Sequence, residues 1–162
     1  MQHIGADKWI NAFSPGIPHV ASVSLGETFE VDTMDAYGGQ IHSPEILRTE
    51  IDMELFDTAT GPIRIDGVRA GDVLAVHIEE IRLGTWGVMA VRPGIGLAGD
   101  LIDSVTTMII PVDGDGAHLP GGPTVPLRPM VGVLGVARHD EAIRAHTPGD
   151  HAANLDTTCL TS

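Results

Sequence analysis

Val73-Leu74-Ala75-Val76-His77-Ile78-Glu79-Glu80-Ile81 is the stretch that decides the predicted fold class. It begins as a continuous apolar run and becomes alternating, which is typical of a strand buried first on both faces and then on one. Three further β-rich runs follow: Trp86–Val91, Thr106–Val112 and Val131–Ala137. Helical periodicity is convincing nowhere, although residues 99–105 have room for one or two turns. Short strands separated by Gly and Pro predict an all-β chain, a sandwich or a barrel.

Two further segments complete the expected organisation. The alternating runs His19–Leu25 and Phe29–Thr33, joined by Gly26-Glu27, predict a β-hairpin. Residues 111–129 are rich in Gly and Pro, and we expect one long loop there. No repeat or low-complexity segment divides the chain, so residues 1–162 are interpreted as a single β-rich domain.

Composition narrows the function classes. The 162 residues include 22 acidic and 9 basic side chains, which gives a formal net charge of −13. Such a surface repels phosphate backbones and anionic membranes, so neither nucleic acid nor membrane is expected as a partner. The 43% hydrophobic content is that of a folded chain. With the single cysteine Cys159 and no leader-like or membrane-length apolar run, we expect a cytoplasmic protein.

Two glycine-rich motifs do not carry a site. Residues 94–99 match G-x-G-x-x-G, but strands flank them and no α/β alternation follows, which favours a tight glycine turn over a dinucleotide site. Residues 113–116 begin like a calcium loop, but His118 stands where that loop needs Gly and Thr124 where it needs Glu.

The segment Thr147-Pro148-Gly149-Asp150-His151-Ala152-Ala153-Asn154-Leu155-Asp156 carries the densest chemistry. It places two carboxylates, an imidazole and a carboxamide within seven residues. Oxygen and nitrogen donors without thiolates suit a divalent metal at a hydrolytic site. The alternative is a loop rich in Asx turns, whose polar side chains cap neighbouring backbone groups.

Read in order, five pieces of the chain resemble the acetamidase/formamidase family. They are Val31–Ile41, Thr60–Val76, Pro93–Asp100, Pro129–Ala137 and the loop Pro148–Asp156, which resembles the family's "PG.HGGN.D". Each piece alone is a weak signal, but their common order makes the resemblance specific.

The resemblance implies a β-sandwich or jelly-roll-like enzyme that hydrolyses small amides to a carboxylate and ammonia with a metal at its site. Carried over by position, it places His151, Asn154 and Asp156 at the site, with Asp35 and Gln40 lining it from the earlier segment.

We expect Asp150, His151 and Asp156 to hold the metal, most simply zinc, whose bound water would attack the amide. Asp35 is the predicted proton carrier, Asn154 the predicted donor to the oxyanion, and Gln40 a predicted substrate contact.

Two departures from the family pattern shape the expected assembly. The usual paired glycines of the loop are Ala152 and Ala153 here, and family members continue into a second half with further histidine and acidic motifs. We therefore expect a fold that is incomplete without a second polypeptide, in a hetero-oligomer whose site both chains build. How the chain comes to end at Ser162 stays open between a gene boundary, processing and self-cleavage.

Three alternatives remain at this point. The chain is either the catalytic subunit just described, a non-catalytic scaffold half that binds the catalytic one, or a stand-alone barrel of cupin type. The last needs three or four ligands clustered on paired strands, and the sequence offers no such arrangement. The substrate stays open among formamide, acetamide, a cyclic amide and a carbamate.

Overall fold

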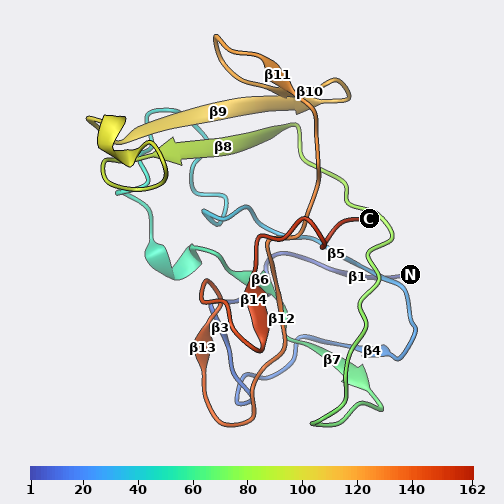
Figure 1. The fold of residues 1–162 in the computed structure, drawn as a ribbon. Helices are drawn as coiled ribbons and strands as arrows, with labels where there is room; N and C mark the ends of the chain where they lie inside the picture. The colour runs from blue at the N-terminus through green and yellow to red at the C-terminus, as the bar shows by residue number, and fades with distance from the viewer.

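The longest strands are β8 (Trp86–Val91) and β9 (Thr106–Asp113), which pair antiparallel along their lengths. Both were predicted from the sequence, β8 with the same bounds. The structure, a computed structural model, describes residues 1–162, and Figure 1 shows β8 and β9 as a layer lying across one end of the molecule.

The remaining strands are short, because Gly and Pro interrupt the chain every few residues. They are β1 (Gln2–Ile4), β2 (Trp9–Ile10), β3 (Ala12–Phe13), β4 (Ala21–Ser24), β5 (Phe29–Val31), β6 (Ala59–Thr60), β7 (Ile63–Asp66), β10 (Gly116–His118), β11 (Thr124–Val125), β12 (Val133–Gly135), β13 (Ile143–Arg144) and β14 (Ala152–Asn154). Two single 3-10 turns are the only helical elements, η1 (Met53–Leu55) and η2 (Gly99–Leu101).

The strands form one four-stranded sheet, in the order β11-β10-β9-β8, and five two-stranded sheets. The predicted all-β class is confirmed, whereas its sandwich or jelly-roll detail stays a prediction. The predicted hairpin is wrong: β4 and β5 do not pair with each other, because β4 pairs in parallel with β7 and β5 with β1. The turn between them does form, with the Glu27 amide donating to the Ser24 carbonyl at 3.0 Å.

The segment predicted as one loop over residues 111–129 instead contains β10 and β11. Asp115 N–H donates to the Asp113 carboxylate at 2.9 Å, which closes the turn from β9 into β10. A Cβ on Gly116 would lie 2.5 Å from the Val125 carbonyl oxygen, so only glycine allows β11 to approach. The motif at 113–116 therefore builds a strand turn.

The segment Val73–Ile81, predicted as a strand, is not one. No strand lies between the end of β7 at Asp66 and the start of β8 at Trp86. The glycine turn at 94–99 does form: Gly94 and Gly96 adopt φ of 74° and 80°, and the Gly94 amide donates to the Gly99 carbonyl at 3.0 Å.

The buried core is small. Only 13 of 162 residues are buried, and the main cluster consists of Ile10, Phe13, Ala145 and Ala153. This cluster joins β2, β3 and β14, so the loop that carries the candidate site chemistry rests directly on it. The structure contains no helix with the length and apolar character needed to cross a bilayer.

Candidate active site

The loop Gly149–Asp156 is held against β12 by close backbone packing. Strand β14 pairs antiparallel with β12, and Gly149 forms an isolated bridge with Ala152. A Cβ on Gly135 would lie 2.8 Å from both the Ala153 nitrogen and the His151 carbonyl oxygen. Gly135 therefore lets the site loop sit directly on β12.

His151 lies inside the molecule. Its exposure is 7%, and its ring packs edge-on to Phe13 with the ring centroids 5.8 Å apart. The Nε2 atom is buried and has no hydrogen-bond partner within this chain. A buried polar atom without a partner is costly, so this nitrogen is free to serve a ligand or a group from another polypeptide.

The structure does not gather the three predicted metal ligands. The Asp150 side chain is 98% exposed, with its carboxylate 3.9 Å from Arg138, while His151 is buried beside it in the sequence. No group of three His, Cys, Asp or Glu residues in the chain could hold a metal ion. Asp150, His151 and Asp156 therefore do not fit a metal site on their own.

Asn154 instead faces an acid that lies far away in the sequence. Its Nδ2 donates to Oδ2 of Asp57 at 3.2 Å, in a half-buried position. Asp156 contributes the second carboxylate of this group, because its charge acts on Asp57. The structure thus brings Asn154 and Asp156 together around Asp57.

The environment of Asp57 disfavours its charged form. Burial raises the pKa of this carboxyl above its ordinary value, and the Asp156 carboxylate raises it further, while His146 and Arg48 act in the opposite direction. A carboxyl with a raised pKa holds a proton more readily than a solvated one, which is a property of groups that transfer protons.

Left-handed backbone is concentrated at the same place. The only non-glycine residues with positive φ are Asp57 (51°), Ala152 (69°), Ala153 (68°) and Asp156 (44°). Three belong to the loop and the fourth is its polar partner. Strain of this kind persists only where the surrounding structure imposes it, and it clusters at functional sites.

The side chains of Asp35 and Gln40 form hydrogen bonds that stabilise the loop that contains them. Oδ1 of Asp35 accepts from the Tyr37 and Gly39 amides, at 2.7 and 3.2 Å, as in an Asx turn. The Gln40 amide donates to the carbonyls of Tyr37 and Asp52 and accepts from the Asp52 N–H. This ties the loop to the residue that caps η1.

That loop and η1 together position Asp57. The Asp57 amide donates to the Ala36 carbonyl at 2.9 Å, directly after η1. Arg144 of β13 forms two hydrogen bonds with Glu54 of η1, at 3.0 and 2.8 Å. Because β13 pairs with β3, this ion pair fastens η1 to the core that carries the site loop.

Sequence reasoning missed Asp57. It follows a short turn, matches no spacing motif and lies 97 residues before Asn154. Its one distinctive local feature is a left-handed backbone, which Asp and Asn tolerate better than most residues. This feature is visible in the structure but not in the sequence.

Solved structures of known proteins share this architecture. The acetamidase of Bacillus halodurans superposes with a TM-score of 0.94 at 36% identity, over 98% of this chain and 54% of that one. The acetamidase of Yersinia enterocolitica gives 0.85 at 25% identity, over 99% and 53%. The formamidase of Methylophilus methylotrophus is 33% identical over 73 residues, which cover 44% of this chain and 18% of that protein.

The fold is therefore that of an amidase-like β protein. The sequence pattern of the Acetamidase/Formamidase family matches residues 2–158, and the chain belongs to this family. It spans about half the length of the solved relatives.

Proposed function

We propose that this chain is one part of an enzyme that hydrolyses the carbon–nitrogen bond of a small amide. The family membership supports the reaction class, and the observation that carries the site is the Asn154–Asp57–Asp156 group. Formamide and acetamide are the first substrates to test, because the matched relatives are named for them.

The proposed roles follow from which atoms are already engaged. One N–H of Asn154 is donated to Asp57, which leaves the second to stabilise the oxyanion that forms when water adds to the amide carbonyl. Asp57 accepts the proton from the attacking water and returns it to the leaving nitrogen as the carbon–nitrogen bond breaks. The products are the carboxylate and ammonia.

We assign the proton transfer to Asp57 in preference to Asp35. One carboxylate oxygen of Asp35 is occupied by two backbone amides, and the side chain is exposed, whereas Asp57 is half-buried beside a second carboxylate. Gln40, proposed from the sequence as a substrate contact, supports the site through the loop that it braces.

The proposal includes a divalent metal only if a second polypeptide supplies further ligands. The nitrogen and oxygen donors favour zinc. This chain gathers no three metal-binding side chains, and His151, whose buried Nε2 has no partner within the chain, is the residue that we propose would contribute. When bound, such a metal would activate a water and polarise the amide carbonyl.

The test is the release of ammonia from formamide and acetamide by the protein isolated from its own source cells. We expect Asp57→Asn and Asn154→Ala each to lower kcat by about a hundredfold or more, in line with the loss of a proton carrier or an oxyanion donor. Asp115→Asn, an exposed carboxylate in the β9–β10 turn, is the matched control and retains activity. Unchanged turnover in both site variants contradicts the assignment.

The second candidate is a scaffold that binds a catalytic partner without taking part in the chemistry. The observation that favours it is the pair Ala152 and Ala153, which keep left-handed backbone where the family's glycines would adopt it freely. Full activity of the assembled enzyme with both Asp57→Asn and Asn154→Ala would favour this role.

A further inference from the structure

The segment of residues 73–84 has the sequence of a strand but none of a strand's hydrogen bonds. Neither backbone nor side-chain groups of the chain bond to any N–H or C=O in this stretch. Backbone polar groups in folded proteins pair with other backbone, side chains or water, and a strand-like run left entirely to water is unusual.

Apolar side chains of the same segment are also uncovered. Val73 is 96% exposed, Val76 60% and Leu83 48%. β-Branched and aliphatic residues suit a pleated surface, and Leu74, Ile78 and Ile81 are half-buried against this chain. The segment therefore has a partly packed face but no neighbouring strand.

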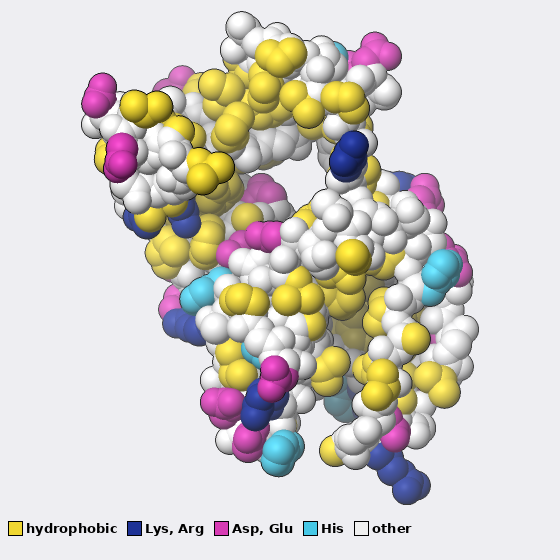
Figure 2. All heavy atoms as spheres, in the orientation of Figure 1, with side chains coloured by type: hydrophobic (Ala, Val, Ile, Leu, Met, Phe, Trp, Pro, Cys, Tyr) yellow, Lys and Arg dark blue, Asp and Glu magenta, His cyan; other side chains and the backbone are white.

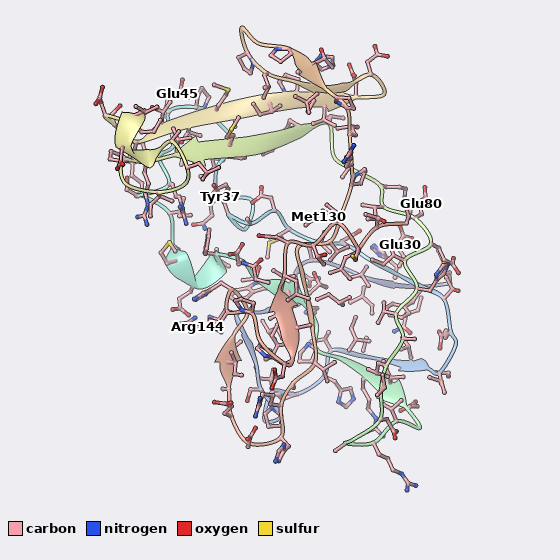
Figure 3. The ribbon with its side chains drawn as sticks, viewed as in Figure 1. Glu30, Tyr37, Glu45, Glu80, Met130 and Arg144 are labelled. Atoms are coloured by element: carbon pink, nitrogen blue, oxygen red, sulfur yellow. The ribbon has the colours of Figure 1, made fainter.

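Two side-chain contacts hold the segment in place despite its free backbone. The Thr28 hydroxyl donates to Glu79 at 3.1 Å, and Arg82 pairs with Glu30 of β5. Figure 1 shows the segment running along the outside of the molecule on the side of both termini, and Figure 3 shows Glu30 and Glu80 on that side. Side-chain contacts therefore hold the segment near β5, while its backbone N–H and C=O groups have no partner in the chain.

The accessible surface of the whole molecule is larger than that of a typical folded monomer of its mass. Its accessible area is 10583 Å², whereas a folded monomer of this mass exposes about 7,700 Å². The excess of about 2,900 Å² on this chain corresponds to a total of about 5,800 Å² over both partners, which is at the upper end of what obligate interfaces bury. Figure 2 shows hydrophobic side chains gathered over the β8–β9 layer and inside the hollow beneath it.

We propose that residues 73–84 form a β-strand by pairing with an extended segment of a second polypeptide, which supplies the rest of the family fold. This inference rests on the proposed function for the existence of that partner. This chain spans 54% and 53% of the two solved relatives. A polypeptide equivalent to the remainder of those chains is long enough to cover the excess surface. Docking by strand addition uses main-chain hydrogen bonds for affinity and alternate side-chain pockets for specificity.

Charge selects the partner strand. A second copy of this chain would set Glu79 and Glu80 against identical residues in any register that aligns the two segments, and like charges opposite each other destabilise a strand pair. The net charge of −13 adds to that repulsion between copies. The partner strand is therefore apolar on its packed face and carries lysine or arginine opposite these glutamates.

Hydrogen exchange tests the docking directly. The untagged protein is isolated from its source cells, and exchange at residues 73–84 is compared between that preparation and the 162-residue chain alone. We expect full exchange within seconds in the chain alone and at least about a hundredfold slower exchange in the isolated complex. Absence of a second polypeptide, fast exchange in the complex, or protection already present in the chain alone would overturn the proposal.

A variant pair separates docking from folding. Ala75→Pro removes an N–H that bonds to nothing in this chain, so the chain alone keeps its unfolding midpoint, whereas affinity for the second polypeptide falls about tenfold or more. Asp115→Asn, at an exposed polar position in the β9–β10 turn, is the control and leaves affinity unchanged. Equal affinity of the Ala75→Pro chain contradicts the proposal.

The same preparation distinguishes the two claims. Protection of residues 73–84 without amide hydrolysis would retain the docking strand and reject the proposed activity. Hydrolysis by a complex in which these residues exchange freely would retain the proposed activity and reject the docking strand.

Discussion

Four residues other than glycine adopt left-handed backbone: three lie in the site loop, and the fourth, Asp57, accepts a hydrogen bond from Asn154 of that loop. Two of them, Ala152 and Ala153, occupy positions where related loops carry paired glycines. An L-residue in this conformation costs about 1–2 kcal/mol, which glycine avoids at an entropic cost of about 0.5–1 kcal/mol. The loop therefore keeps its shape at the expense of stability.

Replacing these alanines by glycine tests that account. Ala152→Gly should raise the free energy of unfolding by about 0.5–1 kcal/mol, because it relieves the left-handed strain. Ala153→Gly should change it little, because the relief is offset by the loss of a fully buried methyl group, worth about 0.8 kcal/mol. Urea unfolding of the two variants measures the difference, and a loss of stability in Ala152→Gly would contradict it.

Asp57 makes stability depend on pH. Its pKa is raised in the folded state, so the folded chain binds the proton more tightly than the unfolded chain does. The free energy of unfolding therefore falls as the pH rises from the unfolded pKa through the folded one. The Asp57→Asn variant lacks this penalty and should gain stability relative to the parent at pH 7, but not at pH 3.

Solvent screening of this half-buried group limits the gain to less than about 1 kcal/mol. Thermal unfolding at the two pH values measures it, with Asp115→Asn as the exposed control. Equal differences between parent and Asp57→Asn at pH 3 and pH 7 would contradict the linkage. Gained stability together with lost activity would mark Asp57 as a residue kept for function.

At the scale of elements, the site depends on how closely β14 approaches β12. The contact runs through Gly135, whose place no side chain can take without meeting backbone of the loop. Gly87 in β8 offers the comparison, since a Cβ there would meet nothing within 4 Å.

Gly135→Ala should lower the free energy of unfolding by about 1–3 kcal/mol, the usual cost of overpacking. Gly87→Ala should leave it unchanged or raise it slightly, because alanine restricts the unfolded chain. Urea unfolding compares the two, and similar effects in both variants would show that the approach of β14 is not tight.

At the scale of the molecule, an area of 10583 Å² with 13 buried residues describes a chain with little core of its own. We expect the isolated chain to bind a hydrophobic dye such as ANS and to unfold with a low urea m-value, since m follows the surface exposed on unfolding. The complex with the proposed second polypeptide should bind much less dye. Equal dye binding by chain and complex would contradict a large covered interface.

Much of the local structure could be predicted from the residues. Strand β8, most of β9 and the glycine turn at 94–99 could all be predicted, because β-branched runs and glycine positions report local backbone preference. The family could also be identified from the sequence, since its motifs keep their order along the chain.

Two errors in the predicted strand pairing share one cause. The runs around β4 and β5 do contain strands, but each pairs with a strand distant in sequence, and a local pattern names no partner. The same holds for Val73–Ile81, where the pattern of a strand is present and the strand to pair with is not.

By itself, the sequence determined the β class, the positions of the main turns, the family and the loop with Asn154 and Asp156, because these depend on neighbouring residues. Only the tertiary structure decided that Asp57 faces that loop, that Asp150 and His151 diverge, and that residues 73–84 stand unpaired. Those facts rest on contacts between residues far apart in the chain. Such contacts are set by packing and burial of the whole fold, which no local pattern encodes.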